Sequence, residues 1–384
     1  MGRRLPTGPQ SIMMSVMAER IRGGATARAH AKAAAVILLA LLGLLALLLA
    51  VLGPHDAFDF RNAYMGAARA VVDGRSPYPP TGDWLISHDR AYVYPPTLAV
   101  MLVPLTLVPE WFAVFVWALV CVGAVGGSLW LAGVRDARVY FVAYLWAPVY
   151  PGLQNLNASL VVMFFVAVAW RYRERAVVAG LAVGAAIALK LFVWPLVIWL
   201  AATRRWRAAA IAAASGVGMI ALSWAVISFR GIGRYPGLLD ELTRLRLGVS
   251  HSVTSIGIGL GLSRGAATAV AVVVGALLVG GCVRAARQGA DAVSLMLALA
   301  AGLAVIPIVW QHHMLVLLIP LAVLRPRLSL VWFAMIPPWL LFVTGYGMLW
   351  HQVFPTIFAA IVVIACAVPS LRRGGVTRPA AASA

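Results

Sequence analysis

Charged side chains are scarce in this chain of 384 residues: only 11% are Asp, Glu, Lys or Arg, whereas 62% are hydrophobic. A soluble domain is about one quarter charged, so this chain could not cover a water-facing surface. Long apolar runs point the same way, because residues 33–52 carry no charge and could span a hydrocarbon core of about 30 Å. The sequence therefore predicts an all-α integral membrane protein.

Acidic residues and cysteines are also few, with 12 Asp and Glu against 31 Lys and Arg, and three cysteines. The net charge of +19 does not indicate nucleic-acid binding, because the basic residues form short clusters between apolar runs, as cytoplasmic loops do. Cys121, Cys282 and Cys366 lie in apolar runs without metal-ligand spacing and are interpreted as buried hydrophobes. No dense acidic cluster suggests a metal site, and we expect no metal and no other cofactor.

The basic clusters orient the apolar segments, because cytoplasmic loops are enriched in Lys and Arg. We expect residues 1–32 to be a disordered cytoplasmic tail, 33–370 a single transmembrane domain, and 371–384 a short cytoplasmic tail. The expected fold is a multi-span helical bundle with about 12 crossings. Parity requires that one early segment, 94–108 or 139–150, does not cross, and the sequence leaves open which one. The expected cytoplasmic clusters are 171–175, 204–207, 284–287 and 325–327, which leaves 229–265, 308–313 and 349–352 outside.

The largest polar stretch, 54–93, follows the first apolar run and contains acidic and basic residues in near balance. Apolar residues within 59–73 recur at helical spacing and predict a helix that ends at Gly74. We expect this helix to lie in the membrane interface, with Tyr64 and Tyr78 at headgroup level. Asp59 then stands at the amino terminus of the helix, where it could be a capping residue or a general base.

Three further polar features interrupt apolar sequence, and each has a structural alternative. Lys190, at the turn of a short helix pair predicted for 176–203, is a functional candidate at membrane depth or a side chain that snorkels to the surface. His312 and His313 could bind a phosphate or carry a proton, or could simply end a helix. The segment 154–157, Gln-Asn-Leu-Asn, could hold sugar hydroxyls or cap the next helix.

The loop 230–264 is basic although it is predicted to lie outside the cell, contrary to the usual charge distribution. An anionic ligand such as a lipid phosphate would explain this charge. Within the loop, the Gly- and Ser-rich stretch 250–261 is typical of a re-entrant or substrate-lining segment.

Several motifs, taken in order, resemble those of glycosyltransferase family 87, and together they cover most of residues 55–325. They are Asp59-Phe-Arg-Asn-Ala-Tyr64, Asp73-Gly74-Arg-Ser-Pro-Tyr78, Tyr94-Pro95-Pro96, Gln154-Asn155-Leu156-Asn157, Ala179-Gly180-Leu181 through Lys190, and Trp310-Gln311-His312-His313. The resemblance implies a GT-C fold, which is a multi-span bundle whose active site faces away from the cytoplasm.

The resemblance also implies the activity: transfer of a hexose, often mannose, from a polyprenyl phosphate to a lipid-linked glycan at the outer face of the cell membrane. Inversion is the expected outcome, with Asp59 as the catalytic base. Asp56 lies only three residues earlier, so the choice between these two carboxylates stays open. The candidate donor-phosphate and substrate contacts are His312, His313, Lys190, Gln154, Asn155, Tyr64, Tyr94 and His251.

The alternative is a multi-span transporter or flippase of a glycolipid. Such proteins place polar groups near the midplane of the membrane and show symmetry between their halves. Here the polar groups gather toward one face and the halves do not match. This pattern favours the transferase.

Overall fold

The computed structural model describes residues 57–340 and 349–373, and these residues form helices without any β-strand. Four helices among them are long and apolar enough to cross a membrane: α5 (Glu110–Leu131), α11 (Trp206–Val226), α14 (Arg264–Arg287) and α18 (Leu349–Arg373), of which Leu349–Val368 is the apolar part. The predicted all-helical, multi-span class is confirmed. The predicted tail 1–32, the first span 33–53 and residues 374–384 lie outside the described residues.

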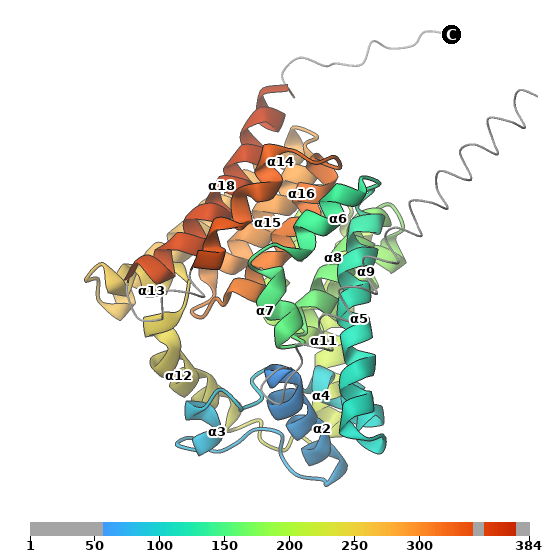
Figure 1. Ribbon diagram of the computed structural model, residues 1–384, viewed down its shortest axis with the longest axis vertical. Coiled ribbons are helices and arrows are strands. Elements are labelled where there is room, and N and C mark those ends of the chain that lie inside the picture. Colours follow the sequence, from blue (N-terminus) through green and yellow to red (C-terminus); the bar gives the residue numbers. More distant parts are fainter. Residues whose placement is uncertain (1–56, 341–348, 374–384) are drawn as a thin grey trace, which may run out of the picture.

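The helices form three neighbouring regions (Figure 1). The C-terminal helices α14, α15, α16 and α18 lie together in the upper part of the view, and α5, α8, α9 and α11 form a second group beside them. Helices α2, α3, α4 and α12 build the lower end.

The remaining α-helices are α2 (Met65–Val72), α3 (Trp84–Ser87), α4 (Pro96–Leu102), α6 (Ala137–Tyr144), α7 (Val149–Gln154), α8 (Ser159–Arg171), α9 (Ala176–Leu189), α10 (Leu196–Ala202), α12 (Tyr235–Arg246), α13 (Val253–Gly259), α15 (Asp291–Val305) and α16 (Leu318–Leu324). The segment η1 (Asp59–Tyr64) is a π-helix. The 3-10 helices are η2 (Val103–Leu107), η3 (Leu191–Val193), η4 (Leu247–Val249), η5 (Gln311–Leu317), η6 (Leu330–Met335) and η7 (Pro337–Leu340).

The helix predicted in the first polar loop is present as η1, a π-helical turn, which continues directly into α2. The chain leaves this helix at Gly74, whose φ of +64° is a left-handed conformation that glycine adopts readily. Its apolar side packs on α4 and η2, so Tyr64 is fully buried. Tyr78 is also buried and stacks on Trp224 of α11, with the ring centroids 5.2 Å apart. The protein itself therefore covers both tyrosines, and their position at headgroup level stays a prediction.

The pair of short helices predicted for 176–203 is confirmed. Helix α9 ends at Leu189, Lys190 has an extended backbone with φ −147°, and η3 and α10 follow. Gly302 of α15 allows this turn to approach closely, because a Cβ atom there would collide with the carbonyl oxygen of Phe192. Because Gly302 has no side chain, the turn that contains Lys190 can lie close to α15.

Helices α9 and α11 pack closely through small residues. Gly180 and Gly184 lie four residues apart on one face of α9, the spacing that lets helices approach in membranes. A Cβ atom on Gly180 would lie 2.6 Å from Cβ of Ile211 and 2.9 Å from the carbonyl oxygen of Ala208. Because α9 ends next to Lys190, this packing also sets the depth of that side chain.

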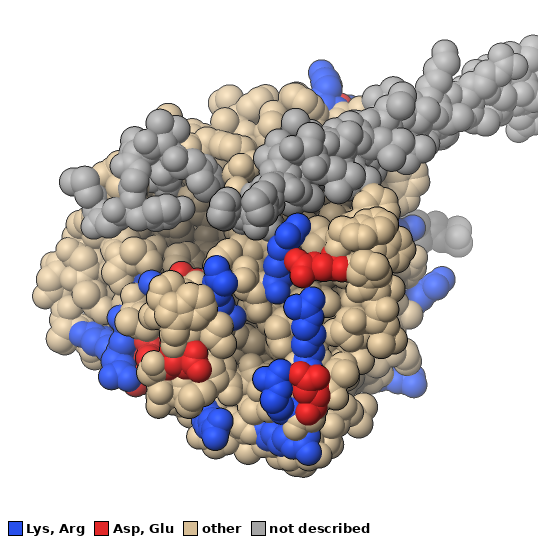
Figure 2. All heavy atoms as spheres, turned by 60° about the horizontal axis from the view of Figure 1, so that its bottom comes forward, with Lys and Arg blue, Asp and Glu red and all other residues tan. Residues whose placement is uncertain are grey.

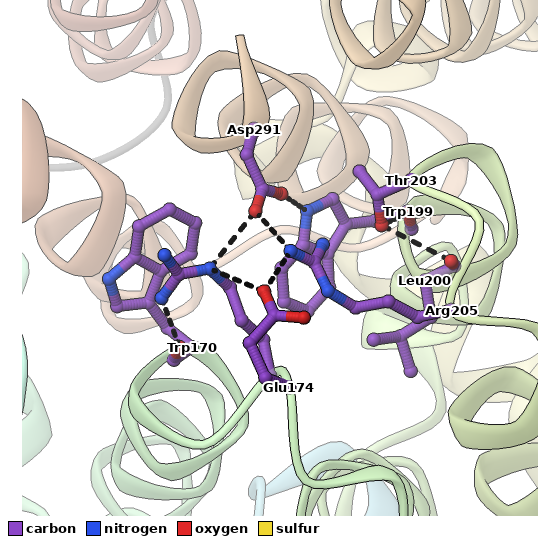
Figure 3. Close-up of polar contacts among 8 residues, drawn as sticks. Trp170, Glu174, Trp199, Leu200, Thr203, Arg205 and Asp291 are labelled. Atoms are coloured by element: carbon purple, nitrogen blue, oxygen red, sulfur yellow. Dashed lines mark hydrogen bonds and ion pairs between the residues drawn. The ribbon is translucent and has the colours of Figure 1, made fainter. Parts of the chain in front are cut away.

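Three turns with basic clusters meet at one end of the bundle around Asp291, the first residue of α15 (Figure 3). Its Oδ2 accepts hydrogen bonds from Nε of Arg173 at 3.0 Å and from Nη2 of Arg205 at 2.8 Å. Its Oδ1 accepts from Nε1 of Trp199 at 2.8 Å, and Arg205 also pairs with Glu174 at 2.6 Å. The α8–α9, α10–α11 and α14–α15 turns therefore lie on the same side, as their charges predicted.

Helix α11 leads from this cluster to the opposite end of the molecule, where side chains of both charges gather (Figure 2). There Nε of Arg246 donates to Oδ1 of Asp89 at 2.7 Å, and Arg244 pairs with Asp240 at 3.4 Å. Part of the positive charge of the loop 230–264, which we attributed to an anionic ligand, is therefore balanced by ion pairs within the protein.

We expect Gly180→Ala to destabilise the protein, because the new Cβ would overlap Ile211 and the backbone of α11. The cost of such overpacking is about 1–3 kcal/mol in the free energy of unfolding. Thermal unfolding in detergent measures it. The matched control is Gly218→Ala on α11, where a Cβ atom meets nothing within 4 Å. Equal midpoints for the two variants would contradict this account of the α9–α11 contact.

Candidate active site

A cavity of about 490 Å³ opens beside the amino end of η1. This volume lies within the range of about 300–1,000 Å³ that is usual for small-molecule sites. Segments far apart in the sequence line the cavity: the first loop, the turn after α7, the end of α12 with the loop that follows, and the start of η5. The predicted site residues among its lining are Asp59, Tyr64, Tyr94, Asn155, His251 and His312.

The other three predicted residues, Gln154, Lys190 and His313, do not line the cavity. Gln154 acts through its backbone, whose carbonyl oxygen accepts the N–H of Ala57 at 2.7 Å. Lys190 and His313 lie behind Asp59 and contact each other. The structure thus brings most predicted residues into one wall and places this pair in a layer behind it.

Asp59 does not cap its own helix. The N-cap residue is Phe58, which makes no side-chain capping bond, and the carbonyl oxygen of Asn155 accepts the N–H of Phe60 instead at 3.3 Å. Oδ2 of Asp59 accepts a hydrogen bond from Nδ2 of Asn157 at 2.5 Å. The capping alternative is therefore wrong, and the carboxylate is held by another segment of the chain. Asp56 lies outside the described residues.

Asn157 connects Asp59 to Lys190. Its Oδ1 accepts hydrogen bonds from Nζ of Lys190 and from the backbone N–H of Ser159, both at 2.9 Å. The second bond fixes which end of the amide carries oxygen, because a backbone N–H can only donate. It also caps the start of α8, as the sequence suggested for this segment. One amide therefore orients a carboxylate on one side and an amine on the other.

Lys190 is only 2% exposed, so the alternative that it snorkels to the surface is wrong. Its Nζ donates to Oγ of Ser159 at 2.7 Å and lies 3.3 Å from Nε2 of His313. The same atom stands 4.7 Å from the ring centroid of Tyr94, within the range of a cation–π contact. Lys190 is therefore enclosed by polar partners.

Sequence reasoning missed Asn157 and Ser159 as site residues. Asn157 was considered only as part of a polar segment, and its direction depends on Leu156, whose φ of +51° is left-handed. This turn sends Asn155 toward the cavity and Asn157 toward Lys190. Left-handed backbone in a residue other than glycine costs about 1–3 kcal/mol and is concentrated at functional sites.

Three buried atoms in the cavity wall have no hydrogen-bond partner within the described part of the chain: Nδ1 of His251, Oε1 of Gln311 and Nε2 of His312. A buried polar group without a partner costs about 1–3 kcal/mol, so a polar ligand is the expected partner. The rings of His312 and His313 have centroids 4.7 Å apart, yet His312 lines the cavity whereas His313 meets Lys190. The two adjacent histidines therefore have different surroundings.

Burial changes the acid–base properties of two groups in the cavity wall, Asp59 and His251. Burial raises the pKa of Asp59 above 3.8, whereas the hydrogen bond from Asn157, and Lys190 when its amine is protonated, act in the opposite direction. Burial lowers the pKa of His251 to about 4, so this imidazole is neutral at pH 7. Across 57–340 and 349–373, no three His, Cys, Asp or Glu side chains are grouped to hold a metal ion.

We expect Asn157→Leu to lower stability, because the apolar side chain leaves both Asp59 and Lys190 without a shared partner. Leaving a buried polar group unpaired costs about 1–3 kcal/mol, more for a charged group. Chemical or thermal unfolding in detergent measures this loss. Asn155→Leu is the control, since Asn155 lines the cavity and leaves the Asp59–Lys190 connection intact. If Asn157→Leu left the unfolding midpoint unchanged, the hydrogen bonds from Asn157 to Asp59 and Lys190 would add no stability.

Comparisons with known proteins identify the family. The model of glycosyltransferase family 87 matches residues 92–310, and no solved structure matches the chain. The chain is 27% identical over 252 residues to a polyprenol-phosphate-mannose-dependent alpha-(1-2)-phosphatidylinositol pentamannoside mannosyltransferase of Mycolicibacterium smegmatis, a match covering 60% of each protein. It is 26% identical over 248 residues to the protein of that name from Mycobacterium tuberculosis, covering 60% of this chain and 57% of the relative. The match thus spans about three fifths of the length of these relatives. Because the family match extends over more than half of the sequence, this chain belongs to glycosyltransferase family 87.

Proposed function

We propose that this protein transfers a mannosyl residue from a polyprenyl phosphate to a lipid-linked glycan at the outer face of the cell membrane. Family membership supports glycosyl transfer, and the names of both relatives support polyprenyl-phosphate mannose as the donor. The observation that carries the proposal is the Asp59 carboxylate, held by Asn157 at the wall of a cavity with unpaired polar atoms. Family membership also favours a transferase over the alternative of a glycolipid transporter.

Asp59 is the proposed general base. Asn157 engages Oδ2, which leaves Oδ1 to accept the proton of the acceptor hydroxyl as its oxygen attacks the anomeric carbon. The bond between the anomeric carbon and the phosphate oxygen breaks in the same displacement. The configuration at the anomeric carbon is thereby inverted, the proton resides on Asp59, and the polyprenyl phosphate leaves as an anion.

The leaving phosphate needs donors and positive charge near the developing anion. His251 and His312 each present a ring nitrogen without a hydrogen-bond partner in the described part of the chain, and Lys190 contacts the neighbouring His313. Asn155 and the two cavity tyrosines, Tyr64 and Tyr94, supply amide and phenol groups that can receive sugar hydroxyls. Gln154 contributes indirectly, because its backbone holds the chain just before η1.

The two ends of the bundle support an outward-facing site. The basic turns gathered at Asp291 are the part that the positive-inside rule assigns to the cytoplasm. The cavity is lined by the end of α12 and the first loop, which lie at the opposite end. We therefore infer that the site faces outward.

We expect Asp59→Asn to reduce mannosyl transfer by about 10²–10⁴-fold, because the amide cannot take the acceptor proton. Purified protein in detergent, supplied with polyprenyl-phosphate mannose and a phosphatidylinositol mannoside acceptor, measures the rate. Asp73→Asn is the matched control at the end of the same helix, where the exposed carboxylate pairs with Arg75, and it should keep full activity. Full activity of Asp59→Asn would exclude this base and direct attention to Asp56.

The rate should also depend on pH in a defined direction. The base must be ionised, and burial raises the pKa of Asp59 above 3.8. When the pH is lowered, the transfer rate should therefore begin to fall at a higher pH than it would if the base were an aspartate with an ordinary pKa. The pH profile of the transfer rate tests this, and an acidic limb at or below 3.8 would contradict it.

A further inference from the structure

The contact between Lys190 and His313 shows which atom must carry the proton. The backbone N–H of Trp310 donates to Nδ1 of His313 at 2.9 Å, so Nδ1 is an acceptor. A neutral imidazole that accepts at Nδ1 carries its hydrogen on Nε2, and that atom lies 3.3 Å from Nζ of Lys190. An ammonium group has no lone pair to receive this hydrogen, whereas a neutral amine has one.

The remaining partners of Nζ agree with a neutral amine. Oδ1 of Asn157 accepts from Nζ at 2.9 Å, and Oγ of Ser159 accepts at 2.7 Å. Asn157 cannot be turned to present its NH₂ group, because Oδ1 also receives the backbone N–H of Ser159. Two donated bonds and one accepted bond are the full capacity of an uncharged amine.

The groups that face Lys190 from the surrounding elements fit this protonation state. Asp59 of η1 is reached only through Asn157, and no ion pair within 4.0 Å joins Lys190 to a carboxylate in the described residues. His312 and His313 approach from η5, and the ring of Tyr94 lies before α4. A buried charge without a paired counter-charge is costly, so these surroundings favour the uncharged amine.

We propose that Asn157 and His313 hold Lys190 as a neutral amine in the substrate-free protein, and that Lys190 takes up a proton when the phosphate of a polyprenyl-phosphate donor enters the cavity. The identity of this ligand rests on the proposed function, whereas the neutral amine does not. One proton from solvent binds Nζ, and no bond between heavier atoms changes. The proton returns to solvent when the phosphate leaves.

Protonation of Lys190 also changes what His313 can do. Once Nζ has lost its lone pair, it no longer accepts the Nε2–H group of His313. That N–H is then available to another acceptor, and His312, which lines the cavity, lies beside it with the ring centroids 4.7 Å apart. The incoming anion thus acquires a cation and a hydrogen-bond donor in one step, because a nearby negative charge favours the charged form of an amine.

The sequence offers a direct test, because Lys32 and Lys190 are its only lysines. In Lys32→Arg protein made with lysine labelled with ¹⁵N at Nζ, the single side-chain NMR signal reports Lys190. We expect the chemical shift of a neutral amine at pH 7 in detergent, and that of an ammonium after polyprenyl phosphate is added. Polyprenol without the phosphate should leave the signal unchanged.

An ammonium signal without ligand would overturn the proposal, as would an amine signal that persists with polyprenyl phosphate bound. In His313→Gln, whose side-chain oxygen can accept from an ammonium, the titration midpoint of the signal should rise by about one pH unit or more. His312→Gln is the control, because His312 makes no hydrogen bond to Lys190. Since no sugar transfer is measured, a protein that shows the switch but lacks transferase activity would refute the proposed function alone.

Discussion

The amide of Asn157 is the interaction on which the site depends. It lies between a carboxylate and an amine, and it bonds to both. A direct pair would occupy Lys190 with Asp59 and reduce the basicity of the carboxylate. With the amide between them, Asp59 lines the cavity and Lys190 contacts Asn157, Ser159 and His313.

The fold supports this arrangement through close backbone contacts. Gly302 of α15 lets the Lys190 turn approach, and Gly180 of α9 brings that helix against α11. On the other side, the carbonyl oxygens of Gln154 and Asn155 hold the start of η1, so that Asp59 and Asn157 are placed by one turn of chain. The packing of the helices therefore positions both Asp59 and Lys190, the two partners of Asn157.

The far end of the molecule has a different electrostatic organisation. Around Asp291, arginines and carboxylates pair directly and join three turns. At the cavity, by contrast, polar atoms of His251, Gln311 and His312 have no hydrogen-bond partner within 57–340 and 349–373. The ion pairs at Asp291 hold helices together. The polar atoms at the cavity can bind a ligand, and for this reason the catalytic proposal rests on the cavity.

The sequence by itself determined the membrane class, the helix after Asp59, the break at Lys190 and the common side of the basic turns. These properties depend on composition, periodicity and charge near the residues concerned, which are local. It also named Asp59, Lys190 and the two histidines through motifs. Only the tertiary structure decided that Asp59 is held by Asn157, that Tyr64 and Tyr78 are buried, and that His313 faces Lys190. Those facts depend on contacts between residues more than 90 positions apart in several cases, and on a left-handed turn at Leu156, and no local pattern encodes such contacts.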